Sequence, residues 1–67
     1  MILSADGLDD ALIGMCSRTG RYIYSSEKCI EILAKEMPPE EALEYFYFNT
    51  AGAYVGEGTP IFMEEVQ

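Results

Sequence analysis

The side chains of this 67-residue sequence that could hold a metal ion are three aspartates near its start. Asp6, Asp9 and Asp10 are close together, and their carboxylates are ligands of the kind that Ca²⁺ and Mg²⁺ prefer. Their spacing differs from the Asp-x-Asp-x-Asp-Gly pattern of a calcium loop, and no glutamate follows at the required distance. The pattern therefore favours a solvated turn, with binding of an ion by these three carboxylates as the alternative.

The two cysteines, Cys16 and Cys29, are the only nucleophilic thiols. Cys29 falls near the start of a predicted helix, where the helix amino terminus can lower the pKa of a thiol. The sequence contains no histidine, so catalytic triads, Cys–His dyads and the common zinc sites are excluded. We therefore expect Cys29 to be a core residue, with a Cys16–Cys29 disulfide as an alternative. We expect no catalytic, metal-binding or cofactor-binding residues, and no enzymatic activity.

The charge is strongly acidic and unevenly distributed. Twelve acidic residues against four basic ones give a net charge of −8, and no basic residue follows Lys35. Direct nucleic-acid binding is disfavoured, because phosphate contacts require lysine or arginine. A basic protein partner is compatible with this charge, although solubility alone would also explain it.

Periodicity and turn signals divide the chain into five segments of a single domain, 1–67. Pro38 and Pro39 separate two helices, because proline ends one helix and is tolerated in the first turn of the next. The run 11–18 also fits a helical stripe, but its length and interior glycine favour a strand. The predicted segments are an arm and turn at 1–10, a hairpin at 11–25, helices at 26–37 and 39–56, and a strand at 60–66.

These segments predict an α+β fold of order ββααβ. We expect a three-stranded antiparallel sheet with two helices on one face, and with the last strand beside the first. Both faces of the first strand are apolar, which indicates cover on each side or cover by a partner chain.

Four consecutive aromatic residues, Tyr45 to Phe48, lie in the second predicted helix. They cannot all enter one small core, because consecutive helical residues point in different directions. Exposed aromatic surface often marks a contact site. Gly52 lies in a run of small residues that would permit close approach of another backbone. The predicted interface residues are Tyr45, Tyr47, Phe48, Gly52 and Tyr54.

A chain of this size can bury only a small core, so we expect a homodimer. The first residues lack the basic and long apolar regions of a signal peptide, and no apolar run is long enough for a membrane span. We therefore expect a cytoplasmic protein without membrane contact.

The segment Asn49-x-x-Gly52-Ala53-x-x-Gly56-Glu57-x-Thr59-Pro60 and the upstream run 24–33 resemble small proteins of phages and environmental bacteria. The resemblance covers about residues 9–63. That family has no assigned activity, so the resemblance implies a phage-like, intracellular context and no site residues.

Together these observations predict a non-enzymatic protein-interaction module that self-associates. The alternatives are an acidic inhibitor that mimics nucleic acid towards a host protein and a small carboxylate-based metal-binding protein.

Overall fold

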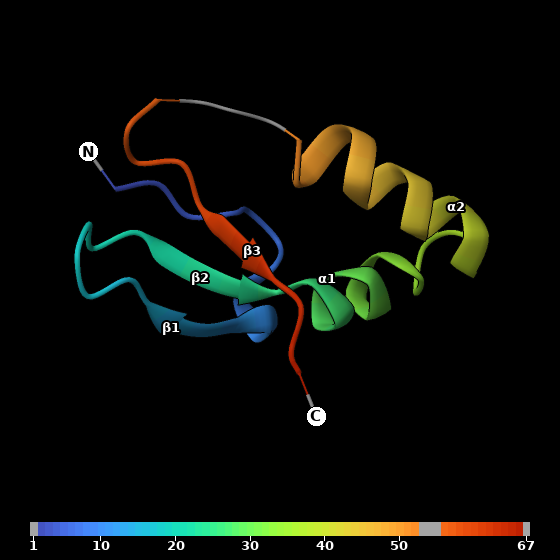
Figure 1. The fold of residues 1–67 in the computed structure, drawn as a ribbon. Helices are drawn as coiled ribbons and strands as arrows, with labels where there is room; N and C mark the ends of the chain where they lie inside the picture. Colours follow the sequence, from blue (N-terminus) through green and yellow to red (C-terminus); the bar gives the residue numbers. More distant parts are fainter. Residues whose placement is uncertain (1, 53–55, 67) are drawn as a thin grey trace.

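The computed structural model describes residues 2–52 and 56–66 and has the predicted α+β class (Figure 1). A three-stranded sheet is combined with two α-helices, a short 3₁₀ turn and a π-helical segment. In chain order the elements are η1 (Asp9–Ala11), β1 (Leu12–Met15), β2 (Tyr22–Ser25), α1 (Ser26–Leu33), α2 (Pro39–Tyr45), the π-helix η2 (Phe46–Thr50) and β3 (Ile61–Met63).

The hairpin of β1 and β2 is antiparallel, and its turn is closed by backbone hydrogen bonds. The Cys16 N–H donates to the Arg21 carbonyl, and the Gly20 N–H donates to the Cys16 carbonyl, both at 2.8 Å. Gly20 has a φ of 76°, which glycine adopts readily because it has no Cβ. Of the two interpretations of residues 11–18, the strand is therefore correct over Leu12–Met15.

The third strand corrects the prediction of a wholly antiparallel sheet with the last strand beside the first. The strand order is β1-β2-β3, and β3 runs parallel to β2 with Ile23 opposite Ile61 and Tyr24 opposite Phe62. After β2, the chain passes through both helices before β3 begins (Figure 1). A connection of this length can return to the start of β2, which is the requirement for a parallel pair.

Both helices begin where the sequence predicts but are shorter. The Ser25 side chain caps α1 by accepting a hydrogen bond from the Lys28 N–H at 3.3 Å. Beyond Leu33 the Lys35 and Glu36 N–H groups donate to carbonyls three residues earlier, so the last turn tightens before the prolines.

The second predicted helix, 39–56, divides into α2 and the π-helix η2. The Ala51 N–H donates to the Phe46 carbonyl at 2.7 Å, which is the five-residue spacing of a π-helix. Gly52 follows in a turn, and residues 53–55 lie outside the described part.

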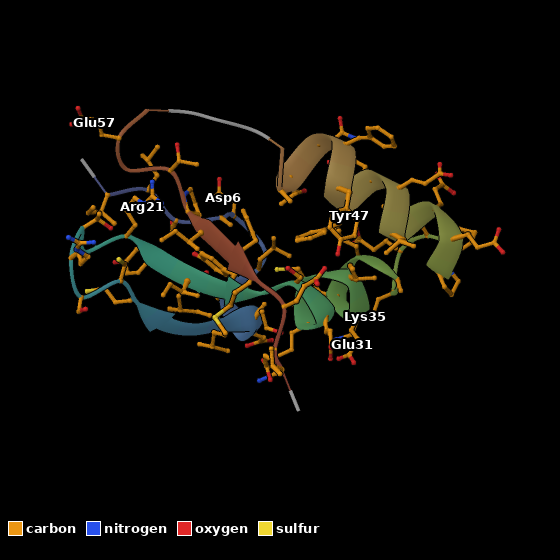
Figure 2. The ribbon with its side chains drawn as sticks, in the orientation of Figure 1. Asp6, Arg21, Glu31, Lys35, Tyr47 and Glu57 are labelled. Carbon is orange, nitrogen blue, oxygen red and sulfur yellow. The ribbon has the colours of Figure 1, made fainter. Side chains whose placement is uncertain are left out.

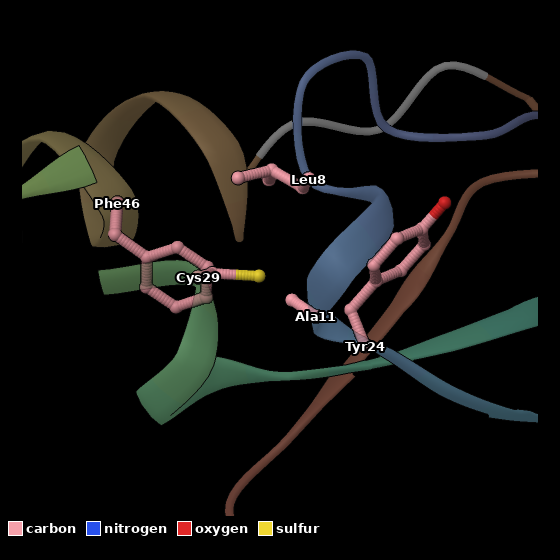
Figure 3. Packing of buried hydrophobic residues seen from close by; sticks show 5 residues of the cluster. All are labelled: Leu8, Ala11, Tyr24, Cys29 and Phe46. Carbon is pink, nitrogen blue, oxygen red and sulfur yellow. The ribbon is translucent and has the colours of Figure 1, made fainter. Parts of the chain in front are cut away.

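The core contains residues from the sheet, the helices and the amino-terminal segment (Figure 3). Its buried members are Leu8, Ala11, Tyr24, Cys29 and Phe46. Cys29 is fully buried, so its predicted place in the core is confirmed, and both cysteines are free thiols rather than a disulfide. The segment predicted as an arm and turn, 1–10, is thus part of the core through Leu8.

Three aromatic rings join the sheet to the helices. The Phe62 ring lies 5.6 Å from the Tyr24 ring and 5.4 Å from the Phe46 ring, measured between centroids. Tyr24 also fixes the amino-terminal segment, because its hydroxyl accepts a hydrogen bond from the Ala5 N–H at 2.9 Å. Tyr24 is therefore the residue through which strand, helix and amino-terminal segment are connected.

We expect Tyr24→Phe to destabilise the protein by about 0.5–1.5 kcal/mol, because the Ala5 N–H loses its acceptor. Urea unfolding followed by circular dichroism measures this change. Tyr22→Phe is the matched control, since Tyr22 also packs against the core and its hydroxyl makes none of the side-chain hydrogen bonds found among residues 2–52 and 56–66. Equal stability of the two variants would contradict this role of Tyr24.

Burial of Cys29 predicts a loss of stability at high pH. Burial raises the pKa of its thiol from 9.0 to about 11, whereas in the unfolded chain the thiol ionises near its ordinary value. The contribution of the neutral thiol is therefore complete below pH 9.0 and is lost as the pH rises towards about 11. Its size is about 2–3 kcal/mol, at ~1.4 kcal/mol for each pKa unit.

The measurement is the free energy of unfolding in urea across this pH range for the wild type and for Cys29→Ala. The variant should lack this component of the pH dependence. Parallel pH profiles for the two proteins would refute the assignment to Cys29.

Candidate interaction surface

Only one of the four consecutive aromatics enters the core. Phe46 is fully buried, whereas Tyr45, Tyr47 and Phe48 are 45%, 44% and 81% exposed. The expectation that the core cannot accept all four rings is confirmed. Leu43 is also 47% exposed, so only Ala42 and Phe46 are buried on α2 and η2.

Tyr47 is held against the carboxyl-terminal segment. Its hydroxyl donates to Glu64 Oε1 at 2.7 Å, and its ring meets the Phe46 ring edge-on at 5.0 Å. The hydrogen bond to Glu64 raises the pKa of Tyr47. Figure 2 shows Tyr47 on the side of η2 turned towards the end of β3. Tyr47 therefore links η2 to the residues after β3.

Tyr45 and Phe48 belong to a different side of the helix, which also carries carboxylates. A shallow hollow of about 230 Å³ is lined by Glu41, Glu44, Tyr45, Phe48 and Asn49. These five residues form the acidic–aromatic surface. Their positions three and four residues apart place them on one helix face. Sequence analysis found the two rings but missed the glutamates and the asparagine, although the same spacing could have identified them.

A larger cleft of about 520 Å³ adjoins this surface, because Tyr45 and Asn49 line both hollows. Its apolar lining includes Leu8, Leu33 and Phe62. Its polar lining comes from the amino-terminal segment, the turn after α1 and the π-helix, and includes Ser4, Asp6, Lys35, Glu36, Asn49 and Thr50. Asp6 and Lys35 can be located in Figure 2. The π-helix thus contributes to both hollows, in line with the frequent occurrence of π-helices at functional sites.

The two other predicted interface residues have different outcomes. A Cβ atom on Gly52 would lie 3.2 Å from the Tyr47 carbonyl oxygen, so the glycine relieves a close contact within its own chain. This local reason for the glycine does not require a crossing helix. Tyr54 lies outside the described residues.

The aspartates considered as metal ligands do not form a site. Asp6, Asp9 and Asp10 are all exposed. Within the described residues, no three His, Cys, Asp or Glu side chains are placed to hold a metal ion together.

Cys16 differs chemically from the buried Cys29. It lies at the start of the hairpin turn, where hydrogen bonds from the Thr19 side chain and from the Thr19 and Arg18 backbone lower the pKa of its thiol, with the charge of Arg21 adding to them. The thiolate is the reactive form of cysteine, so Cys16 is the more reactive of the two thiols.

Comparisons with protein-family models, with curated proteins and with solved structures each find no match for this chain. The resemblance to small phage and environmental-bacterial proteins therefore stays a prediction. No helix in the described part of the chain is long and apolar enough to cross a membrane.

We expect iodoacetamide to label Cys16 in the native protein and Cys29 only after unfolding. Thr19→Val should slow the labelling of Cys16 several-fold at neutral pH, because loss of the hydroxyl raises the pKa of this thiol. Mass spectrometry of the two cysteine peptides measures both rates. Ser17→Ala removes a hydroxyl from the same turn and should leave the rate unchanged. Faster labelling of Cys29 than of Cys16 would contradict the burial of Cys29.

Proposed function

We propose that this chain is a non-enzymatic protein-interaction module whose acidic–aromatic surface binds a basic segment of a partner protein. The observation that supports this most is the 81% exposure of Phe48 beside Glu41, Glu44 and Tyr45. Large apolar side chains with this exposure usually mark a contact site when they occur together. Aromatic residues are also the residues most enriched at the centre of protein interfaces.

The charge of the surface selects the kind of partner. Carboxylates form charge-assisted hydrogen bonds with lysine and arginine, and aromatic faces attract the same cations. Among the described residues, none of those that line the hollow is basic. The adjoining cleft adds Asp6 and Glu36 against the single base Lys35. A partner segment that alternates basic and apolar residues fits both hollows.

The same surface suits self-association poorly. Two copies meeting through it would bring Glu41 and Glu44 of each copy into one interface that has no basic residue. Like charges placed together across an interface cost several kcal/mol. We therefore assign Tyr45 and Phe48 to a heterologous partner rather than to a second copy.

A basic partner that normally binds nucleic acid would be a special case of this proposal, since its contact surface is already complementary to negative charge. In that case the module would act as an acidic inhibitor. We place its action in the cytoplasm, and the two free thiols agree with a reducing compartment.

Binding of a labelled peptide of alternating arginine and leucine, followed by fluorescence anisotropy, tests the proposal. We expect Phe48→Ala to weaken binding about tenfold, because about 1.4 kcal/mol of ring burial is lost. The substitution should leave the fold intact, since the side chain is 81% exposed. Val66→Ala is the matched control, because Val66 is 98% exposed and does not line the hollow.

A second variant, Glu41→Gln with Glu44→Gln, should weaken binding and reduce its dependence on salt concentration. A peptide of alternating glutamate and leucine should not bind. If both peptides bind equally, or if Phe48→Ala binds like the wild type, the proposed function is wrong.

A further inference from the structure

The strand register identifies a second apolar surface, on the side of the sheet opposite the core. Tyr24 and Phe62 point into the core, so their neighbours Ile23 and Ile61 point to the other face, because side chains alternate along a strand. Met63, two residues after Ile61, shares their side. Ser25 is opposite Met63, and its side chain caps α1.

The first strand adds two residues to this face. Gly14 is opposite Ile23, and the register shifts between Leu12 and Gly14. In such a bulge two residues oppose one, which places Ile13 beside Gly14 and opposite Ile23. The outer sheet face therefore consists of Ile13, Gly14, Ile23, Ile61 and Met63.

Within the described chain, the edges of this face are exposed. Ile13 is 38% exposed and Met63 is 40% exposed, while Ile23 and Ile61 between them are half-buried. A Cβ atom built on Gly14 would meet no other atom within 4 Å. None of the five residues is charged.

The exposed area of the molecule is larger than that of a compact monomer of the same mass. The chain exposes 4855 Å². A compact monomer of 7.5 kDa exposes roughly 4,250 Å². The excess of about 600 Å² is smaller than the ~800 Å² that each partner buries in an interface of standard size, and it belongs to the chain as a whole. The shortest extent of the molecule is 17 Å, which leaves room for one sheet and one further layer.

We propose that the outer sheet face is covered by the same face of a second copy, so that two sheets pack face to face in a symmetric homodimer. The net charge of the chain favours contact between two copies at the outer sheet face over contact elsewhere. At a net charge of −8, two copies repel each other through most of their surface. The outer sheet face allows contact without bringing carboxylates together, and apolar faces of this kind are typical of homodimers.

A second copy of the chain is also always available in solution to cover the outer sheet face. Within the described part of the chain, the buried core cluster has five hydrophobic members, and small domains with such cores commonly depend on oligomerisation. The dimer is independent of the proposed function, because it uses the sheet and leaves the acidic–aromatic surface free.

Light scattering of the full chain tests the dimer. The wild type should have twice the 7.5 kDa mass of one chain at high micromolar concentration. The double variant Ile13→Lys, Met63→Lys should be a monomer, because two lysines from each copy would face each other across the interface. Phe48→Lys is the matched control, and it should lose binding of the basic peptide while remaining a dimer.

Circular dichroism establishes whether the double variant folds. If it does not, methyl NMR of the wild type with a soluble paramagnetic probe decides the question. The methyl groups of Ile23 and Ile61 should become more exposed to the probe on dilution, whereas the Val66 methyl groups should not change. A wild-type monomer at high concentration would overturn the proposal. So would loss of the dimer in Phe48→Lys with its retention in the double variant.

Discussion

The packing of Phe62 between Tyr24 and Phe46 is the interaction on which the rest of this structure depends. It joins β3 to β2 and the sheet to η2, and the Tyr24 hydroxyl brings in the amino-terminal segment through Ala5. These rings lie on the core side of the three-stranded sheet. Phe46 is buried because it packs against Phe62 there, whereas Tyr45 and Phe48 lie on another helix face and are exposed.

A small core leaves two kinds of surface outside it, and they differ in charge. The acidic–aromatic surface on α2 and η2 combines exposed rings with Glu41 and Glu44. The outer sheet face combines isoleucine and methionine side chains with no charge. The two proposed partners therefore differ in kind: a basic segment suits the first surface, and the second is the one where two acidic copies would meet without facing carboxylates. A module that dimerises through its sheet would present two copies of its acidic–aromatic surface.

The two thiols show how position decides the chemistry of one residue type. Cys29 is enclosed in the core, where burial raises the pKa of its thiol. Cys16 lies in a polar hairpin turn, where hydrogen bonds lower the pKa. The sequence predicted Cys29 as a core residue from its helical spacing. It contained no comparable signal for Cys16, because the groups that act on this thiol converge only when the turn closes.

The sequence by itself determined the α+β class, the hairpin, the starts of both helices and the excess of aromatics, since these follow from local patterns of proline, glycine, capping and periodicity. It did not determine the parallel pairing of β3 with β2, the π-helix after Tyr45, or the entry of Leu8 and Ala11 into the core. The strand pairing and the entry of Leu8 and Ala11 depend on contacts between residues far apart in the chain, and local patterns carry no information about which distant surfaces meet. The π-helix depends on the five-residue hydrogen bond from Ala51 to Phe46, which the residue types did not indicate. Only the tertiary structure could therefore show which aromatic was buried and which face of the sheet was left uncovered.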